Sequence, residues 1–227
     1  MSQETRSAVL HNNVGVECLQ RGEHRRALQH LECAAQTLYS IAPMFKNHQE
    51  ETLNNSQQQQ QLSCGEKFVR LSKKPCMIAK GNALVCSRPI VITENSDLSC
   101  VSFTLRSAAI LFNMGLAYHL SFMRPHAIDG AFLNAKNMYE MAYRLGFQVA
   151  QQGGGGCSDT IVMVALNNLG ELHHELGEFE SARVFMEALS TYIVNLRDPA
   201  EPDDAMKRQE FMLNSMVLRT PQGAAAA

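Results

Sequence analysis

Histidine and cysteine are the side chains in this sequence that could hold a metal ion or act as nucleophiles. The seven cysteines are irregularly spaced and none forms a C-x-x-C pair, so neither a zinc-finger pattern nor a disulfide framework is indicated. His173 and His174 are adjacent, and adjacent side chains on a helix point about 100° apart, which prevents them from sharing one ion. We therefore predict no metal site and no cofactor.

Motifs for nucleophilic or phosphate chemistry are also missing. The sequence contains no G-x-S-x-G elbow, no P-loop and no G-x-G-x-x-G fingerprint. The run Gly153 to Gly156 lacks a following Gly-Lys-Ser/Thr, so a flexible joint is the better interpretation. We predict that the chain is not an enzyme and has no catalytic residues.

Three asparagines have a spacing that could recognise a peptide backbone. Asn13, Asn113 and Asn168 each stand two residues before a glycine. A side-chain amide donates and accepts hydrogen bonds at once, so it can pair with both polar groups of a peptide unit. The alternative is that these asparagines only satisfy neighbouring helix ends.

The elements that would position these asparagines are paired helices. Each of three segments has a glycine in a first helix and a small residue in a second helix, followed at +4 and +7 by larger or apolar residues. Small residues let two helix axes approach closely, which justifies a mid-helix glycine that costs about 1 kcal/mol. Gly22 and Gly177 would end the first helix of two pairs in a left-handed conformation. The predicted crossing residues are Gly15 with Ala27, Gly115 with Ala135, and Gly170 with Ala182.

This spacing resembles the tetratricopeptide repeat (TPR) family, whose pattern runs Trp-x2-Leu-Gly-x2-Tyr, then Ala, an aromatic residue and Ala. The segment from Leu169-Gly170 to Ala182 is the closest match. The family period is about 34 residues, whereas Gly15 and Gly115 are 100 residues apart and Gly115 and Gly170 are 55 apart. The resemblance therefore implies an all-α fold, an interrupted TPR-like stack of three antiparallel helix pairs.

The interruptions set the expected boundaries. Residues 46–66 contain a polar, glutamine-rich tract that we expect to be a disordered loop. Short β-prone runs between 77 and 92 could form a small β-hairpin or an extended crossing strand. The expected parts are 1–45, first pair; 46–98, loop and extended segment; 99–152, second pair; 153–157, Gly-rich joint; 158–197, third pair; 198–220, capping helix; and 221–227, disordered tail.

The capping helix is predicted from Pro202 and the acidic residues after it, which favour a helix start. A stack of repeats exposes an apolar last face that a terminal helix can cover. The apolar stripe expected to do this comprises Met206, Leu213, Met216 and Val217.

The resemblance also implies a function. In the TPR family the first helices line an inner groove, and asparagines in this register hydrogen-bond an extended peptide. The basic residues that grip acidic chaperone tails are absent here, so we expect an apolar or helical segment of an unidentified protein as the ligand. The alternative function is a structural, self-associating subunit, with a homo-oligomer as its expected form. The expected partner-binding residues are Asn13, Val16, Asn113, Leu116, His119, Asn168, Glu171 and His174.

Composition restricts the partners further. The formal net charge is −2, so no basic excess is present to neutralise the phosphates of a nucleic acid. No stretch approaches the roughly 20 apolar residues that a membrane span needs, and the N-terminus has no signal-peptide pattern. We expect a cytoplasmic or nuclear protein that binds neither nucleic acid nor membrane.

Overall fold

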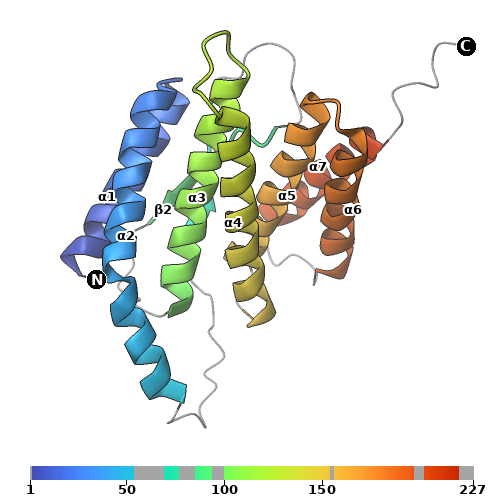
Figure 1. Cartoon of the computed structure of the whole chain (residues 1–227). Helices are drawn as coiled ribbons and strands as arrows, with labels where there is room; N and C mark the ends of the chain where they lie inside the picture. The colour runs from blue at the N-terminus through green and yellow to red at the C-terminus, as the bar shows by residue number, and fades with distance from the viewer. Residues whose placement is uncertain are drawn as a thin grey trace, which may run out of the picture. The chain divides into compact units, whose positions relative to one another are not determined.

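The computed structural model describes residues 2–53, 69–76, 85–93, 100–153, 156–196 and 202–219. This part of the chain is mostly helical (Figure 1). It contains seven helices and one small antiparallel sheet. The predicted helical fold is confirmed at this level. The elements in chain order are α1 (Gln3–Gln20), α2 (His24–Leu53), β1 (Val69–Leu71), β2 (Ile90–Ile92), α3 (Cys100–Phe122), α4 (Ala131–Gln151), α5 (Cys157–Glu175), α6 (Phe179–Asn195) and α7 (Pro202–Arg219).

The chain divides into two compact units, which are described separately below. The first unit comprises Met1–Ala79 and Ser87–Val162, and the second comprises Lys80–Cys86 and Met163–Ala227. In the first unit α1 packs against α2, α2 against α3, and α3 against α4. In the second unit α6 packs against α7.

Two of the turns between paired helices contain a left-handed glycine. Gly22, between α1 and α2, and Gly177, between α5 and α6, both have φ near +75°. Each donates its N–H to the carbonyl three residues earlier at 2.9 Å, and the following residue donates to the carbonyl five residues before it at 2.9 or 3.0 Å. These bonds satisfy the last carbonyls of the first helix. The predicted glycine turns are confirmed.

A glycine lies at a close approach within each of the three helix pairs. A β-carbon at Gly15 would lie 2.8 Å from Leu31 Cγ, and one at Gly115 would lie 2.7 Å from Tyr139 Cδ1. At Gly170 the nearest atom, Met186 Cε, would be closer still. These three contact residues each lie four positions after the small residue of the second helix. Each glycine therefore packs against the same position of the repeated pattern.

The rest of this pattern is buried. The small residue, its +4 neighbour and its +7 neighbour all have no measurable exposure in each pair. A helix that presents positions i, i+4 and i+7 to its partner buries one continuous stripe. The nine residues are Ala27, Leu31, Ala34, Ala135, Tyr139, Ala142, Ala182, Met186 and Leu189.

The sheet joins two short strands far apart in the first half of the chain. β1 and β2 are antiparallel, with Val69 opposite Ile92 and Leu71 opposite Ile90. Beyond the strands, Ser72 N–H donates to Pro89 O at 2.7 Å. The partner of Ile90–Ile92 therefore precedes the stretch 77–92, for which we expected either a hairpin or an extended crossing strand. Residues 77–84 lie outside the described part of the chain.

The end of the first helix pair differs from the expected boundary, and two expected disordered segments cannot be compared with the structure. Helix α2 continues to Leu53, past the boundary expected at residue 45, so residues 46–53 are helical rather than loop. The remainder of the glutamine-rich tract and the tail 221–227 lie outside the described residues. Helix α7, Pro202–Arg219, lies within the segment 198–220 that was expected to hold the capping helix.

The apolar stripe assigned to the capping helix was wrong. Leu213, Met216 and Val217 are 55%, 59% and 56% exposed, whereas Phe211 and Leu218 are buried. Apolar residues occur on both faces of α7, so periodicity alone did not identify the buried one. Polar residues on the buried face are accommodated by hydrogen bonds, as described below for Asn214. The side chain of Met206 lies outside the described residues.

Among the described residues, no helix has the length and apolar character of a membrane span.

Candidate functional site

Asn113 on α3 holds both backbone polar groups of Ile90. Its Oδ1 accepts a hydrogen bond from Ile90 N–H at 2.7 Å, and its Nδ2 donates to Ile90 O at 2.8 Å. The same Nδ2 donates to Asn12 Oδ1 at 2.9 Å. Asn113, Asn12 and Ile90 are fully buried. Such a closed, fully paired arrangement is the form in which buried amides are stable.

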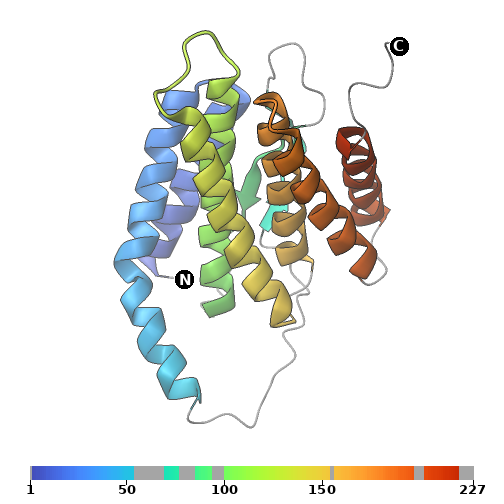
Figure 2. The same ribbon diagram turned by 45° about the vertical axis from the view of Figure 1, so that its right-hand side comes forward.

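Asn13 on α1 makes the same contact with Ile92. Its Oδ1 accepts from Ile92 N–H at 3.1 Å, and its Nδ2 donates to Ile92 O at 2.8 Å. Asn12 supports both sites, because its Nδ2 donates to Ile90 O at 3.2 Å and to Asn13 Oδ1 at 3.1 Å. Figures 1 and 2 show β2 beside α1 and α3, the first helices of their pairs.

These amides take the place of a neighbouring strand. In an extended chain, alternate residues direct their N–H and C=O groups to opposite edges. Ile90 and Ile92 direct theirs to the asparagines, so Val91 directs its own towards Arg70 of β1, its register partner. One edge of β2 therefore pairs with a strand and the other edge pairs with side chains.

The side chains of β2 add an apolar requirement to this backbone contact. Ile90 and Ile92 are buried, as are Val69 and Leu71 of β1, whereas Val91 is partly exposed. Burying a side chain of this size stabilises the packed state by about 1.5–3 kcal/mol. The site thus accepts an extended segment with apolar residues at alternate positions.

The second unit contains the same amide contact. Asn168 Oδ1 accepts from Cys86 N–H at 2.8 Å, and its Nδ2 donates to Cys86 O at 3.2 Å. Asn167 Nδ2 donates to Asn168 Oδ1 at 3.1 Å, as Asn12 does to Asn13 in the first unit. Asn214 of α7 donates to Asn167 Oδ1 at 2.9 Å.

The three predicted asparagines therefore each bind the backbone of an extended segment, and the segment belongs to the same chain. We refer to Asn13, Asn113 and Asn168 as the clamp asparagines. The supporting residues Asn12 and Asn167 were not among the expected site residues. The doublets Asn12-Asn13 and Asn167-Asn168 were a signal for them, because each places a second amide beside the first.

The other expected site residues divide by their helical position. Val16 and Leu116 lie three residues after a clamp asparagine and are buried. His119 lies six residues after Asn113, and six residues turn a helix by about 600°, so it faces about 120° away from that asparagine. Its Nδ1 lies 3.3 Å from Tyr139 Oη inside the α3–α4 pair. We correct its assignment from binding residue to packing residue.

His174 has the same six-residue offset from Asn168. Its ring meets Phe179 edge to face, with centroids 5.3 Å apart. The neighbouring His173 is buried, with its Nδ1 2.5 Å from Glu178 Oε2. These contacts place both histidines at the α5–α6 turn rather than beside Asn168.

Glu171 is the unusual member of the predicted set. It lies three residues after Asn168 and is buried, and its Oε2 has no hydrogen-bond partner within the described residues. Burial, and secondarily the charge of Glu175, raises the pKa of Glu171 from 4.5 to about 7. The carboxyl is therefore substantially protonated near neutral pH.

This pKa predicts a pH-dependent stability. Because the folded pKa is raised, the contribution of Glu171 is fully present below pH 4.5 and is lost as the pH rises through about 7. Glu171→Gln should remove on the order of 2–3 kcal/mol of the stability lost between pH 5 and 8.5. Urea unfolding at both pH values measures this. The control is Glu210→Gln on the exposed face of α7. Equal pH dependence in wild type and both variants would contradict the assignment.

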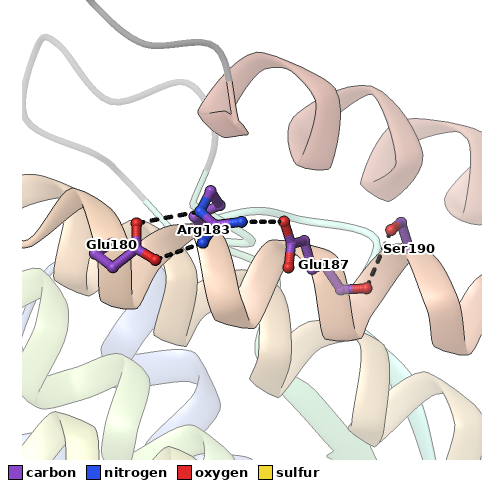
Figure 3. A network of polar contacts seen from close by, with 4 residues as sticks. All are labelled: Glu180, Arg183, Glu187 and Ser190. Atoms are coloured by element: carbon purple, nitrogen blue, oxygen red, sulfur yellow. Dashed lines mark hydrogen bonds and ion pairs between the residues drawn. The ribbon is translucent and has the colours of Figure 1, made fainter.

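A polar network on the surface of α6 is of a different kind. Arg183 binds Glu180 and lies 2.6 Å from Glu187 Oε1, and Ser190 Oγ donates to Glu187 O at 3.1 Å (Figure 3). The hydrogen bond from Arg183 lowers the pKa of Glu180. Both partners of Arg183 are one turn away on the same helix, the geometry of ordinary surface pairs that stabilise a helix modestly.

Within the described part of the chain, no three His, Cys, Asp or Glu side chains are grouped as metal ligands would be. Comparisons of the chain with protein-family models, with curated proteins and with solved structures find no significant match.

Proposed function

We propose that the chain is a protein–protein interaction scaffold whose TPR-like helix pairs bind an extended polypeptide by its backbone. The observation that supports this proposal is the paired hydrogen bonding of Asn113 with Ile90, repeated by Asn13 with Ile92. An amide that binds both groups of a peptide unit recognises extended backbone of any sequence. The alternate isoleucine positions then select apolar side chains, as in other forms of strand addition.

In the structure these asparagines bind a segment of the same chain. A partner peptide must therefore compete with residues 87–93, which are tethered at both ends. A short tether gives an effective concentration on the order of millimolar, without any additional contact. The intact chain should accordingly bind a partner weakly. Only the molecules whose own segment has left the site can bind, so a small open fraction lowers the apparent affinity in proportion.

Replacement of residues 87–93 tests this directly. We expect a full-length variant with a Gly/Ser sequence of equal length to bind a synthetic peptide of residues 87–93 saturably. Isothermal titration calorimetry would measure the affinity, and thermal unfolding would show stabilisation by the added peptide. The same variant carrying Asn113→Ala should bind at least about tenfold more weakly. It loses two buried hydrogen bonds to the peptide backbone, which together contribute about 2 kcal/mol, and a tenfold change needs about 1.4 kcal/mol.

Two controls make the result decisive. A peptide with Ile90→Ser and Ile92→Ser should not bind, and the intact chain should bind the native peptide far more weakly than the replaced variant. If the replaced variant does not fold alone, recovery of its helical circular dichroism on peptide addition is the equivalent positive result. A folded variant that ignores the peptide, or an unfolded one that the peptide does not restore, would refute the proposal.

The exposed face of α7 favours a second candidate function, that of a self-associating subunit. Leu213, Met216 and Val217 are spaced i, i+3 and i+4, so they form one apolar patch. Light scattering after size exclusion separates the two functions. A defined oligomer that Leu213→Glu dissociates would favour the structural subunit, whereas a monomer would favour the scaffold.

A further inference from the structure

Two histidines face one another across the first helix pair. His11 on α1 and His30 on α2 are 19 residues apart in the sequence, and their Nδ1 atoms lie 3.4 Å apart. The ring centroids are 5.6 Å apart, so both nitrogens lie between the rings, on the sides that face each other. Both residues are partly exposed and the contact between them is only part-buried, so a small ion can reach it from solvent.

The packing of α1 on α2 explains why the two rings meet. Gly15 lies one turn after His11, and a β-carbon there would lie 2.8 Å from Leu31 Cγ, the residue next to His30. The close approach of the helices at Gly15 therefore also brings the two histidines together. Asn13 lies about 200° round α1 from His11, so this contact uses a different face of the helix from the clamp.

The distance between the two nitrogens fits a shared metal ion better than a hydrogen bond. N–H donors usually lie about 2.7–3.2 Å from their acceptors. Two nitrogens bound at about 2.0–2.1 Å to one tetrahedral ion stand about 3.3–3.4 Å apart. Neighbouring ligands of a square-planar or octahedral ion with the same bond length would be about 2.9 Å apart. The observed separation of 3.4 Å therefore matches a tetrahedral ion, and Zn²⁺ is the ion that most often has this geometry.

We propose that the Nδ1 atoms of His11 and His30 bind one zinc ion across α1 and α2. A neutral imidazole binds zinc through either ring nitrogen. The two lone pairs face each other, and a small rotation about χ2, a broad torsion in histidine, directs both to one point beside the line that joins them. Among the described residues no third His, Cys, Asp or Glu completes the group, so water takes the remaining positions.

This inference revises the expectation of no metal site. The two histidines are 19 residues apart and belong to no ligand motif, so only the packing of the helices reveals the pair. An ion bound to both rings ties α1 to α2 and forms only in the folded chain, so zinc should stabilise the fold. The site does not depend on the proposed peptide binding.

Titration of the full-length chain with zinc chloride, followed by NMR, tests the proposal. The ring resonances of His11 and His30 should shift saturably with one common affinity, while those of the exposed His126 do not follow them. Both rings should also become the tautomer protonated on Nε2, because zinc occupies Nδ1. His11→Gln should weaken zinc binding at His30 at least about tenfold, since losing even an outer-shell partner of a ligand costs that much. His126→Gln should leave the affinity unchanged.

A cysteine variant separates this site from zinc binding by thiols. Cys33 is exposed and lies three residues after His30, and Cys33→Ser should keep the coupled shifts of both rings. Loss of those shifts in the Cys33 variant would overturn the proposal. So would wild-type shifts that grow linearly without saturating, movement of one ring without the other, or equal weakening by His11→Gln and His126→Gln. The wild-type titration decides the matter even if a variant does not fold.

Discussion

Asn113→Ala should destabilise the chain by about 3–5 kcal/mol, the largest effect we expect from a single side-chain truncation. The substitution removes the Asn113 hydrogen bonds to Ile90 N–H, Ile90 O and Asn12 Oδ1 together, and Ile90 O keeps only the bond from Asn12 Nδ2 at 3.2 Å. Each polar group left unpaired in the interior costs about 1–3 kcal/mol, and water has little access to this fully buried site. Chemical denaturation monitored by circular dichroism measures the loss.

Two other asparagines provide matched comparisons. Asn13→Ala should cost less, about 1–3 kcal/mol, because Asn13 is only partly buried and water can reach Ile92 in its place. Asn137 on α4 is exposed, so Asn137→Ala should change stability by less than about 0.5 kcal/mol. If Asn113→Ala proved as mild as Asn137→Ala, the amide would not hold the segment as described.

Gly115→Ala is the second large effect, a loss of about 2 kcal/mol. On an exposed helix the same change would be favourable by about 1 kcal/mol. Here the new methyl group would lie 2.7 and 2.8 Å from Tyr139 Cδ1 and Cε1, atoms of a rigid, buried ring. Overpacking costs about 1–3 kcal/mol, and contact with a rigid ring places this case at the upper end, so about 2 kcal/mol is lost after the gain in helix propensity. Thermal or urea unfolding reports the net change.

Gly170→Ala is the informative comparison. The nearest atom there is the terminal methyl of Met186, which can rotate away, so the net effect should stay within about 1 kcal/mol. The order of the two losses matters more than either value. A Gly170 variant less stable than the Gly115 variant would mean that the helix pairs do not meet as these contacts indicate.

The helix pairs could be predicted because their signals are local and repeated. Gly15, Gly115 and Gly170 recur in one register with small residues about one helix later, and close packing is the reason for such a pattern. Gly22 and Gly177 marked the turns for the same reason. Helix pairs and their turns are formed by residues that are close in the sequence, so a local sequence pattern is enough to predict them.

The occupant of the clamp asparagines could not be predicted in this way. The amides of Asn13 and Asn113 indicated a peptide backbone, but the segment that reaches them is fixed by long-range packing of Ile90 and Ile92. The partner strand Val69–Leu71 has only three residues, too few for a period-two pattern to stand out. Strand pairing across such sequence distances depends on tertiary contacts.

Two further errors came from helical position. His119 and His174 were expected to bind a partner together with the clamp asparagines, although an offset of six residues does not return a side chain to the same face. On α7 the buried face includes Asn214, whose amide is satisfied by Asn167, so polarity did not mark the exposed side. Both errors concern which face is used, not whether the helix forms.

The contact between the clamp asparagines and a peptide can be observed in the variant in which a Gly/Ser sequence replaces residues 87–93. In its NMR spectrum, adding the 87–93 peptide should shift the side-chain amide resonances of Asn13 and Asn113 with one common affinity, and leave Asn137 unchanged. Peptide binding that leaves the Asn13 and Asn113 amides unmoved would show that these side chains do not recognise the backbone of an extended segment.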